Sequence, residues 1–170
     1  MFSAGEMVVY GGEGVCRVEA VGPSCVPGAD KGKLYYTLRP LSRTGQVLTP
    51  VDTRVLIRPV MTAQEASALI EQLLYLQPEQ PLPSSPRGWK EYYQAVVTSY
   101  DCRRMAALLR LLGSRRAKAL QQGKKPSQLD ERYEKRAEDQ LYSELAVALE
   151  MSRQEVEAQI CRRYPHWPEV

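Results

Sequence analysis

Glycine and proline interrupt the first 60 residues so often that a long helix cannot form there. The breakers are Gly11-Gly12, Gly14, Gly22-Pro23, Pro27-Gly28, Gly32 and Gly45. Between them lie segments rich in Val, Tyr and Leu, which predict five strands at Met7–Tyr10, Val15–Val21, Leu34–Leu41, Gln46–Val51 and Val55–Val60. Five short strands in a stretch of this length are typical of a small, strongly bent β-barrel of the SH3 or Tudor type.

After Pro59 the pattern changes to helical periodicity. Thr62 and Glu65 form a capping box, and apolar residues then recur at helical spacing up to Leu76. The stretch 77–86 contains four prolines and predicts an extended linker. We therefore expect three parts: a barrel over 1–60, a connecting helix and Pro-rich linker over 61–86, and a second domain over 87–170.

Helical patterns fill the second domain. We expect four helices, over Gly88–Ser99, from Asp101 to Leu120, over Leu129–Leu149 and from Ser152 to near Tyr164. Connections of a few residues between helices are typical of an antiparallel bundle. The predicted fold class is α+β, with a Tudor-like or SH3-like β-barrel followed by an all-α helical bundle.

The residue content makes several chemistries unexpected. The four cysteines form no CxxC pair and there is one histidine, so we expect neither a metal site nor a disulfide framework. Glycine-rich phosphate loops and the HExxH and GxSxG motifs do not occur, so we expect no enzyme, no cofactor and no small-molecule ligand. The apolar runs are far shorter than the roughly 20 residues that cross a bilayer, and the first residues lack the pattern of a signal peptide. We therefore expect a cytoplasmic protein without membrane association.

Positive charge is concentrated in one block. Residues 87–125 carry ten Lys and Arg side chains against two acids, a net charge of +8, whereas 61–86 has −3 and 126–170 has −4. An excess of this kind predicts one surface that binds a polyanion. In the helix after Asp101, an apolar stripe lies opposite a basic side, for which we favour phosphate binding over a merely solvated charged face. The basic residues of this side are Arg103, Arg104, Arg110, Arg115 and Lys118.

Several short motifs occur together along most of the chain. In the first 60 residues they are Met1-Phe2, Gly5-Glu6, Val8-Val9-Tyr10, Gly14-Val15, Tyr35-Tyr36, Leu38, Pro50-Val51-Asp52 and Arg58-Pro59-Val60. The second half adds Trp89 with Tyr93, an Asp-capped helix with an Arg-rich end, and Ser143–Ala146. In these residues the chain resembles the CarD/CdnL family of bacterial transcription regulators. Proteins of that family combine a Tudor-like domain that binds the β subunit of RNA polymerase with a helical domain that touches promoter DNA.

The resemblance implies two sets of site residues. It places polymerase contacts near Cys25, Val26 and Leu48, where a strand edge would add to a sheet of the partner. It also implies that Trp89 is a wedge in the minor groove at the upstream edge of the melted promoter, which would stabilise the open complex. From the residues alone, an anchor of the helical core is the favoured interpretation of Trp89, and the resemblance reverses this preference. The remaining DNA contacts are expected from Arg87, Lys90 and Arg132, together with the basic helix. We expect a monomer.

The sequence departs from the family beside Trp89, where Glu91 and Gln94 stand in a turn that usually carries Arg or Lys. DNA contacts are therefore expected to shift toward the basic block, 103–125. Two alternatives remain open. Residues 144–156 look like a helix-turn-helix, which would make the protein an autonomous DNA-binding regulator. The other alternative is an adaptor that binds polymerase and does not contact DNA.

Overall fold

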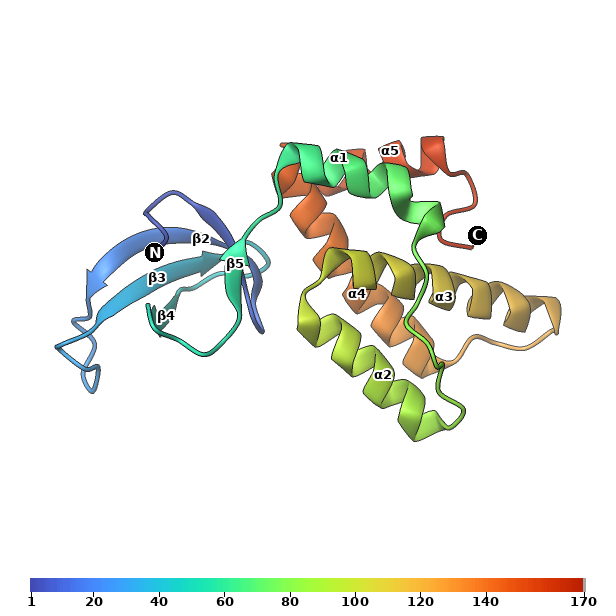
Figure 1. Cartoon of the computed structure of the whole chain (residues 1–170), viewed down its shortest axis with the longest axis horizontal. Helices are drawn as coiled ribbons and strands as arrows, with labels where there is room; N and C mark the ends of the chain where they lie inside the picture. Colours follow the sequence, from blue (N-terminus) through green and yellow to red (C-terminus); the bar gives the residue numbers. More distant parts are fainter. Residues whose placement is uncertain (170) are drawn as a thin grey trace. The chain divides into compact units, whose positions relative to one another are not determined.

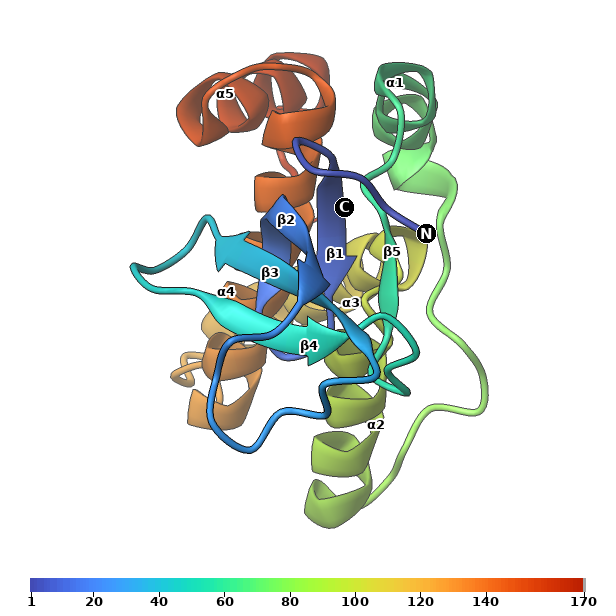
Figure 2. The same ribbon diagram turned by 90° about the vertical axis from the view of Figure 1, so that its left-hand side faces the viewer.

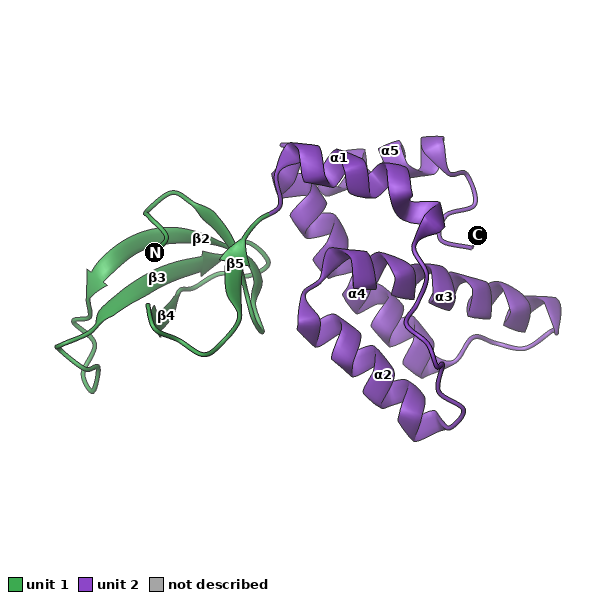
Figure 3. Ribbon diagram, viewed as in Figure 1, with its two compact units in different colours: residues 1–60 green, residues 61–170 purple. Residues whose placement is uncertain are grey.

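The computed structural model describes residues 1–169. The chain divides into two compact units, Met1–Val60 and Met61–Val170, and the second is described as far as Glu169 (Figure 3). The first unit is a β-sheet and the second is helical (Figure 1). This arrangement confirms the α+β class.

Unit 1 contains five antiparallel strands in the order β4-β3-β2-β1-β5 (Figure 2). The strands are β1 (Met7–Tyr10), β2 (Gly14–Pro23), β3 (Leu34–Pro40), β4 (Val47–Pro50) and β5 (Ile57–Pro59). They match the predicted strands to within three residues at each end. Where β2 pairs with β3, the register shifts between Val18 and Ala20, which is a bulge that increases the local twist.

The sheet curls around a small core but stays open. The core is formed by Val8, Tyr10, Cys16, Val18, Tyr36 and Leu38. The hydroxyls of Tyr10 on β1 and Thr49 on β4 are hydrogen-bonded at 3.1 Å, although two strands separate β1 from β4 in the sheet. Within residues 1–169, however, β4 and β5 do not pair, so the expected closed barrel is not confirmed. Both outer strands are short and end at a proline, which limits the pairing that each can offer.

Unit 2 contains five α-helices and one 3₁₀ turn. These are α1 (Ala63–Gln72), η1 (Leu73–Tyr75), α2 (Pro86–Ser99), α3 (Cys102–Gln121), α4 (Gln128–Ala148) and α5 (Arg153–Arg163). Side-chain oxygens of Thr62, Ser85, Asp101, Ser127 and Ser152 cap the five α-helices at their first turns. Each cap accepts hydrogen bonds from amides that have no partner inside the helix, which explains why the predicted helix starts agree closely with the structure.

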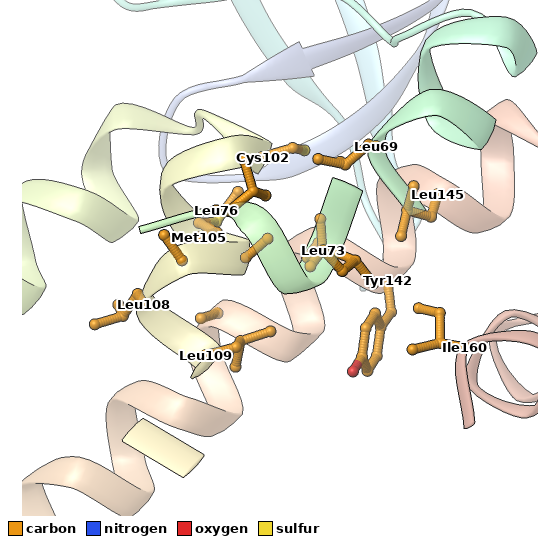
Figure 4. Packing of buried hydrophobic residues seen from close by; sticks show 14 of the residues in the cluster. Leu69, Leu73, Leu76, Cys102, Met105, Leu108, Leu109, Tyr142, Leu145 and Ile160 are labelled. Carbon is orange, nitrogen blue, oxygen red and sulfur yellow. The ribbon is translucent and has the colours of Figure 1, made fainter. Parts of the chain in front are cut away.

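The helices share one apolar core. Side chains from α1, α3, α4 and α5 point toward one another, among them Leu69, Met105, Leu145 and Ile160 (Figure 4). Because the buried side of α1 belongs to this core, the predicted connecting segment over 61–86 does not exist as a separate part. Helix α1 and the Pro-rich stretch are both included in unit 2.

Candidate functional site

Cys25, Val26 and Leu48 lie around one hollow of about 440 Å³ on unit 1. The hollow is formed by the end of β2, the loop that follows it, and the facing parts of β3 and β4. All three predicted residues are exposed, Val26 at 57% and Leu48 at 38%. The structure therefore brings the predicted polymerase-binding residues together, although Cys25 and Leu48 are more than 20 positions apart.

Strand β4 is an outer strand with main-chain groups directed away from the sheet. Val51 donates its amide to the carbonyl of Leu34 at 3.0 Å, and hydrogen-bonded pairs alternate along an antiparallel ladder. The alternation places Leu48, opposite Thr37, in a pair that is not hydrogen-bonded, so its amide and carbonyl point outward. Pro50 occupies the other such position, where an amide is not needed. This edge can accept a strand from a partner.

Trp89 lies in the first turns of α2, after the cap Ser85, and its side chain is half-buried. Its indole packs against Tyr92 in an edge-on contact at 6.1 Å and against Tyr93 at 5.5 Å between ring centroids. The guanidinium carbon of Arg115 lies 4.1 Å from the centre of the indole ring. Trp89 thus borders the core without being enclosed by it. Its packing is what a core anchor would show, and its exposed part is what a wedge in DNA would need.

A hollow of about 290 Å³ opens beside Trp89, where two helix starts lie against a third helix. Its lining comes from the start of α2, the C-terminal half of α3 and the start of α4, and includes Arg115 and Asp130. The first turns of α2 and α4 therefore lie at the same end of unit 2, as Figure 1 also shows. The N-terminal end of a helix carries partial positive charge, which favours anions nearby.

Most arginines of the basic block have partners within unit 2. Arg104 pairs with Glu79, Arg115 with Asp130, and Arg116 with both Glu134 and Glu169. Arg103 donates to the side chain of Gln72 at 2.7 Å, and Arg110 donates to the carbonyl of Leu76 at 2.6 Å. The +8 excess of this block is thus partly balanced by acids that lie before and after it in the sequence.

The remaining predicted cations are exposed. Arg87 pairs with Glu91 one turn further along α2, but its side chain remains 90% exposed. Lys90, Lys118 and Arg132 have exposed side chains and, within residues 1–169, take part in no ion pair. These three lie on α2, α3 and α4, so the structure distributes the candidate DNA contacts over three helices.

Two cations near Trp89's helix were not predicted. Arg136 on α4 lies 5.4 Å from the ring of Tyr133 and donates to Gln94 on α2 at 3.3 Å, and Lys135 beside it is exposed. Lys135 and Arg136 follow Arg132 by three and four residues, a spacing that places all three on one side of a helix. This spacing could have predicted a basic side of α4.

Burial raises pKa values of acids next to these arginines. The pKa of Glu134 is raised by burial, against the opposing effect of Arg116. The pKa of Tyr93 is raised by burial and by its hydrogen bond to Asp130, so this hydroxyl is a donor at every physiological pH.

The candidate helix-turn-helix has an acidic start to its second helix. The connecting residue Glu150 adopts a left-handed conformation with φ of +52°. In α5, Glu155 closes the capping box with Ser152, and Glu157 pairs with Arg153. Carboxylates at this end of a recognition helix would face phosphates, which is unfavourable.

Unit 1 is a sheet with an exposed edge, and the helical unit 2 follows it in the chain. Residues 2–61 match the family model described as the CarD-like/TRCF RID domain, and unit 1 is a CarD-like RNA polymerase-interacting domain. No curated protein matches the chain. The resemblance to this domain is thereby confirmed for unit 1, and it gives the protein a role related to transcription and RNA polymerase as its partner. Within residues 1–169, none of the helices has the length and apolar character needed to span a membrane.

Proposed function

We propose that the protein regulates transcription by docking on the β subunit of RNA polymerase through unit 1 and by contacting promoter DNA through unit 2. The DNA contact lies near the upstream edge of the melted bubble and stabilises the open complex. The protein acts as a monomer in the bacterial cytoplasm, without catalysis and without a cofactor.

The polymerase contact is supported by the gathering of Cys25, Val26 and Leu48 at the open edge of unit 1. A strand from the partner can pair with the outward main-chain groups of β4, while the hollow receives an apolar side chain. Main-chain pairing provides affinity, and the hollow provides specificity.

The DNA contact is supported by Trp89. The indole is half-buried at an end of unit 2 that also carries the first turns of two helices. An aromatic side chain between base steps holds a duplex open where it is already distorted, because unstacking then costs only about a few kcal/mol. Lys90, Lys118 and Arg132 provide phosphate contacts around it.

Co-purification with the isolated β-subunit lobe tests the first half of this proposal. The full chain should bind the lobe, and Leu48→Pro, which removes the outward amide of β4, should lose binding while the protein stays folded. If Leu48→Pro binds as well as the unchanged chain, the β4 edge is not the docking surface.

Open-complex lifetime on a weak promoter tests the second half. We expect the chain to lengthen the lifetime, and we expect Trp89→Ala to shorten it. If Trp89→Ala and the variants of the three exposed cations all leave the lifetime unchanged, the protein is an adaptor that binds polymerase without touching DNA. A strong preference for one duplex sequence, lost on mutation of α5, would instead favour the helix-turn-helix alternative.

A further inference from the structure

Four side chains around Trp89 form a closed ring of contacts. Arg115 lies over the indole at 4.1 Å and donates from Nε to Oδ2 of Asp130 at 2.8 Å. The other oxygen of Asp130 accepts from the hydroxyl of Tyr93 at 2.8 Å, and the ring of Tyr93 lies 5.5 Å from the indole. Asp130 and Tyr93 are buried, at 8% and 0% exposure, so the ring is anchored in the core of unit 2.

Arg115 is therefore held in one orientation by its contacts within unit 2. One face of its guanidinium is covered by the indole, and its Nε donates to Asp130. An arginine that is held by a carboxylate and stacked on an aromatic ring has a fixed orientation, and it restricts the ring that it covers. The neighbouring Lys118 has neither constraint and lies exposed on the same helix.

We propose that Arg115 is a positioning residue for Trp89, held by Asp130 and Tyr93, and that it acts on promoter DNA through the indole and not through phosphate. This inference rests on the proposed function, because it requires Trp89 to contact DNA. In the ring, Asp130 fixes Arg115, Arg115 covers one side of the indole, and Tyr93 supports the indole from within the core. The exposed part of Trp89 is thereby presented to DNA in one orientation.

A double-mutant cycle separates positioning from direct contact. The four proteins are the unchanged chain, Trp89→Ala, Arg115→Gln and the double variant, and the measurement is open-complex lifetime on a weak promoter. If Arg115 acts through Trp89, Arg115→Gln shortens the lifetime several-fold in the unchanged chain and has no effect in the Trp89→Ala background. If the two effects multiply, Arg115 contacts DNA directly, and the proposal is overturned.

The salt dependence of binding provides a second criterion. Arg115→Gln should leave the log–log salt slope unchanged, because no phosphate contact is lost. Lys118→Gln is the matched control, since it removes one positive charge from the same helix and should reduce the magnitude of the slope by about 0.9. A reduction by Arg115→Gln equal to that of Lys118→Gln would also overturn the proposal.

Fluorescence of Trp89 tests positioning without DNA. In a Trp167→Phe background, Trp89 is the one remaining tryptophan, and acrylamide quenching reports how well its indole is shielded. We expect stronger quenching in Arg115→Gln and in Asp130→Asn. Arg115→Lys keeps the charge beside Asp130 if Arg115→Gln fails to fold, and it should also increase quenching because an ammonium group cannot cover the ring as a planar guanidinium does.

The measurements distinguish the two possible failures. If Trp89→Ala leaves the lifetime unchanged, the proposed DNA contact is wrong, and the action of Arg115 on DNA falls with it. If Trp89→Ala shortens the lifetime but the folded Arg115 variants alter neither lifetime nor quenching, the proposed function stands and Arg115 is merely structural.

Discussion

A Cβ atom on Gly113 would lie 2.6 Å from the carbonyl oxygen of Pro168. The C-terminal segment therefore passes directly over α3 at the one residue of that helix without a side chain. Trp167 in the same segment is buried and donates from its indole nitrogen to the hydroxyl of Tyr142 at 2.8 Å. Glu169 pairs with Arg116 on α3 at 3.1 Å. Residues 167–169 are thus part of the packing of unit 2.

Gly113→Ala should destabilise unit 2, although replacement of glycine by alanine inside a helix normally adds about 1 kcal/mol of stability. The added methyl meets backbone atoms of Pro168 and Glu169, so the C-terminal segment must shift, and we expect a net loss of about 1–3 kcal/mol. Urea unfolding of Gly113→Ala and of the control Ser114→Ala, at an exposed neighbour, measures the difference. In a chain shortened to end at Tyr164, the backbone atoms that meet the added methyl are gone, so Gly113→Ala should increase the free energy of unfolding. A loss that persists in the shortened chain would show that another contact is responsible.

Leu48→Pro should abolish binding to the polymerase β lobe while leaving the thermal unfolding of unit 1 close to that of the unchanged chain. Its amide points away from β3, so proline removes no hydrogen bond of the sheet. Leu48→Ala is the matched control, because it keeps the amide and loses only apolar contact in the hollow. We expect weakened but measurable binding for Leu48→Ala in a pull-down titration. Equal losses for both variants would assign the contact to the side chain.

Trp89→Ala should cost about 2 kcal/mol of folding stability, roughly half of the value typical for a fully buried tryptophan, because the indole is only half-buried. Loss of about 1–3 kcal/mol of stacking on a base step would shorten open-complex lifetime by roughly 5- to 150-fold. Thermal unfolding and open-complex decay on the same variant measure both effects. A loss of 4 kcal/mol or more (about the full core value) with a normal lifetime would identify Trp89 as a core anchor.

Binding to duplex DNA should be weak, sensitive to salt and nearly independent of sequence. Five exposed cations of unit 2 that take part in no ion pair within residues 1–169 supply about four or five phosphate contacts, which predicts a log–log salt slope of about −3.5 to −4.5. These residues are Lys90, Lys118, Lys124, Lys125 and Arg132. Lys118→Gln should reduce the magnitude of the slope, whereas Arg104→Gln, which loses an arginine paired with Glu79, should change it little. Fluorescence anisotropy at several salt concentrations measures both slopes, and equal changes would contradict the pairing.

Cys16 should make unit 1 less stable at alkaline pH. Burial raises the pKa of the Cys16 thiol from 9.0 to about 11. Above pH 9 the unfolded chain loses this proton while the folded chain keeps it, so stability falls between pH 9 and 11, by about 2–3 kcal/mol in total. Below pH 9 the contribution is fully present. Denaturant unfolding from pH 8 to 11 should show a smaller decline for Cys16→Ala, which lacks this thiol. Parallel declines would exclude Cys16 as the cause.

The local elements were predictable because their signals are local. The capping residues Thr62, Asp101 and Ser152 mark the starts of three helices, and glycines mark the ends of strands. The gathering of Cys25, Val26 and Leu48 followed from the resemblance and agrees with the structure, whereas their role in binding stays a prediction.

Long-range partners were not predictable from local sequence. The apolar side of α1 is evident from its spacing, but the core that it joins lies on α3, α4 and α5. The net charge of the basic block is likewise reduced by Asp130 and Glu134, which follow the block in the sequence. These two carboxylates reach Arg115 and Arg116 only because α3 and α4 pack against each other. Closure of the sheet depends on how far its two outer strands extend, and strand ends are the least certain part of such a prediction.

Consecutive amides at the junction belong to different units. The amide of Val60 donates to the carbonyl of Met7 in unit 1, and the next amide, that of Met61, donates to the buried carboxylate of Glu144 in unit 2 at 3.0 Å. Because unit 2 follows unit 1 directly in the chain, a polymerase that binds unit 1 keeps unit 2 tethered to the same complex. Its effective concentration at a nearby promoter is then of the order that short linkers produce, about millimolar. If unit 2 contacts DNA as proposed, a surface too weak to find promoters by itself is sufficient under these conditions, and the polymerase then determines which promoter is bound.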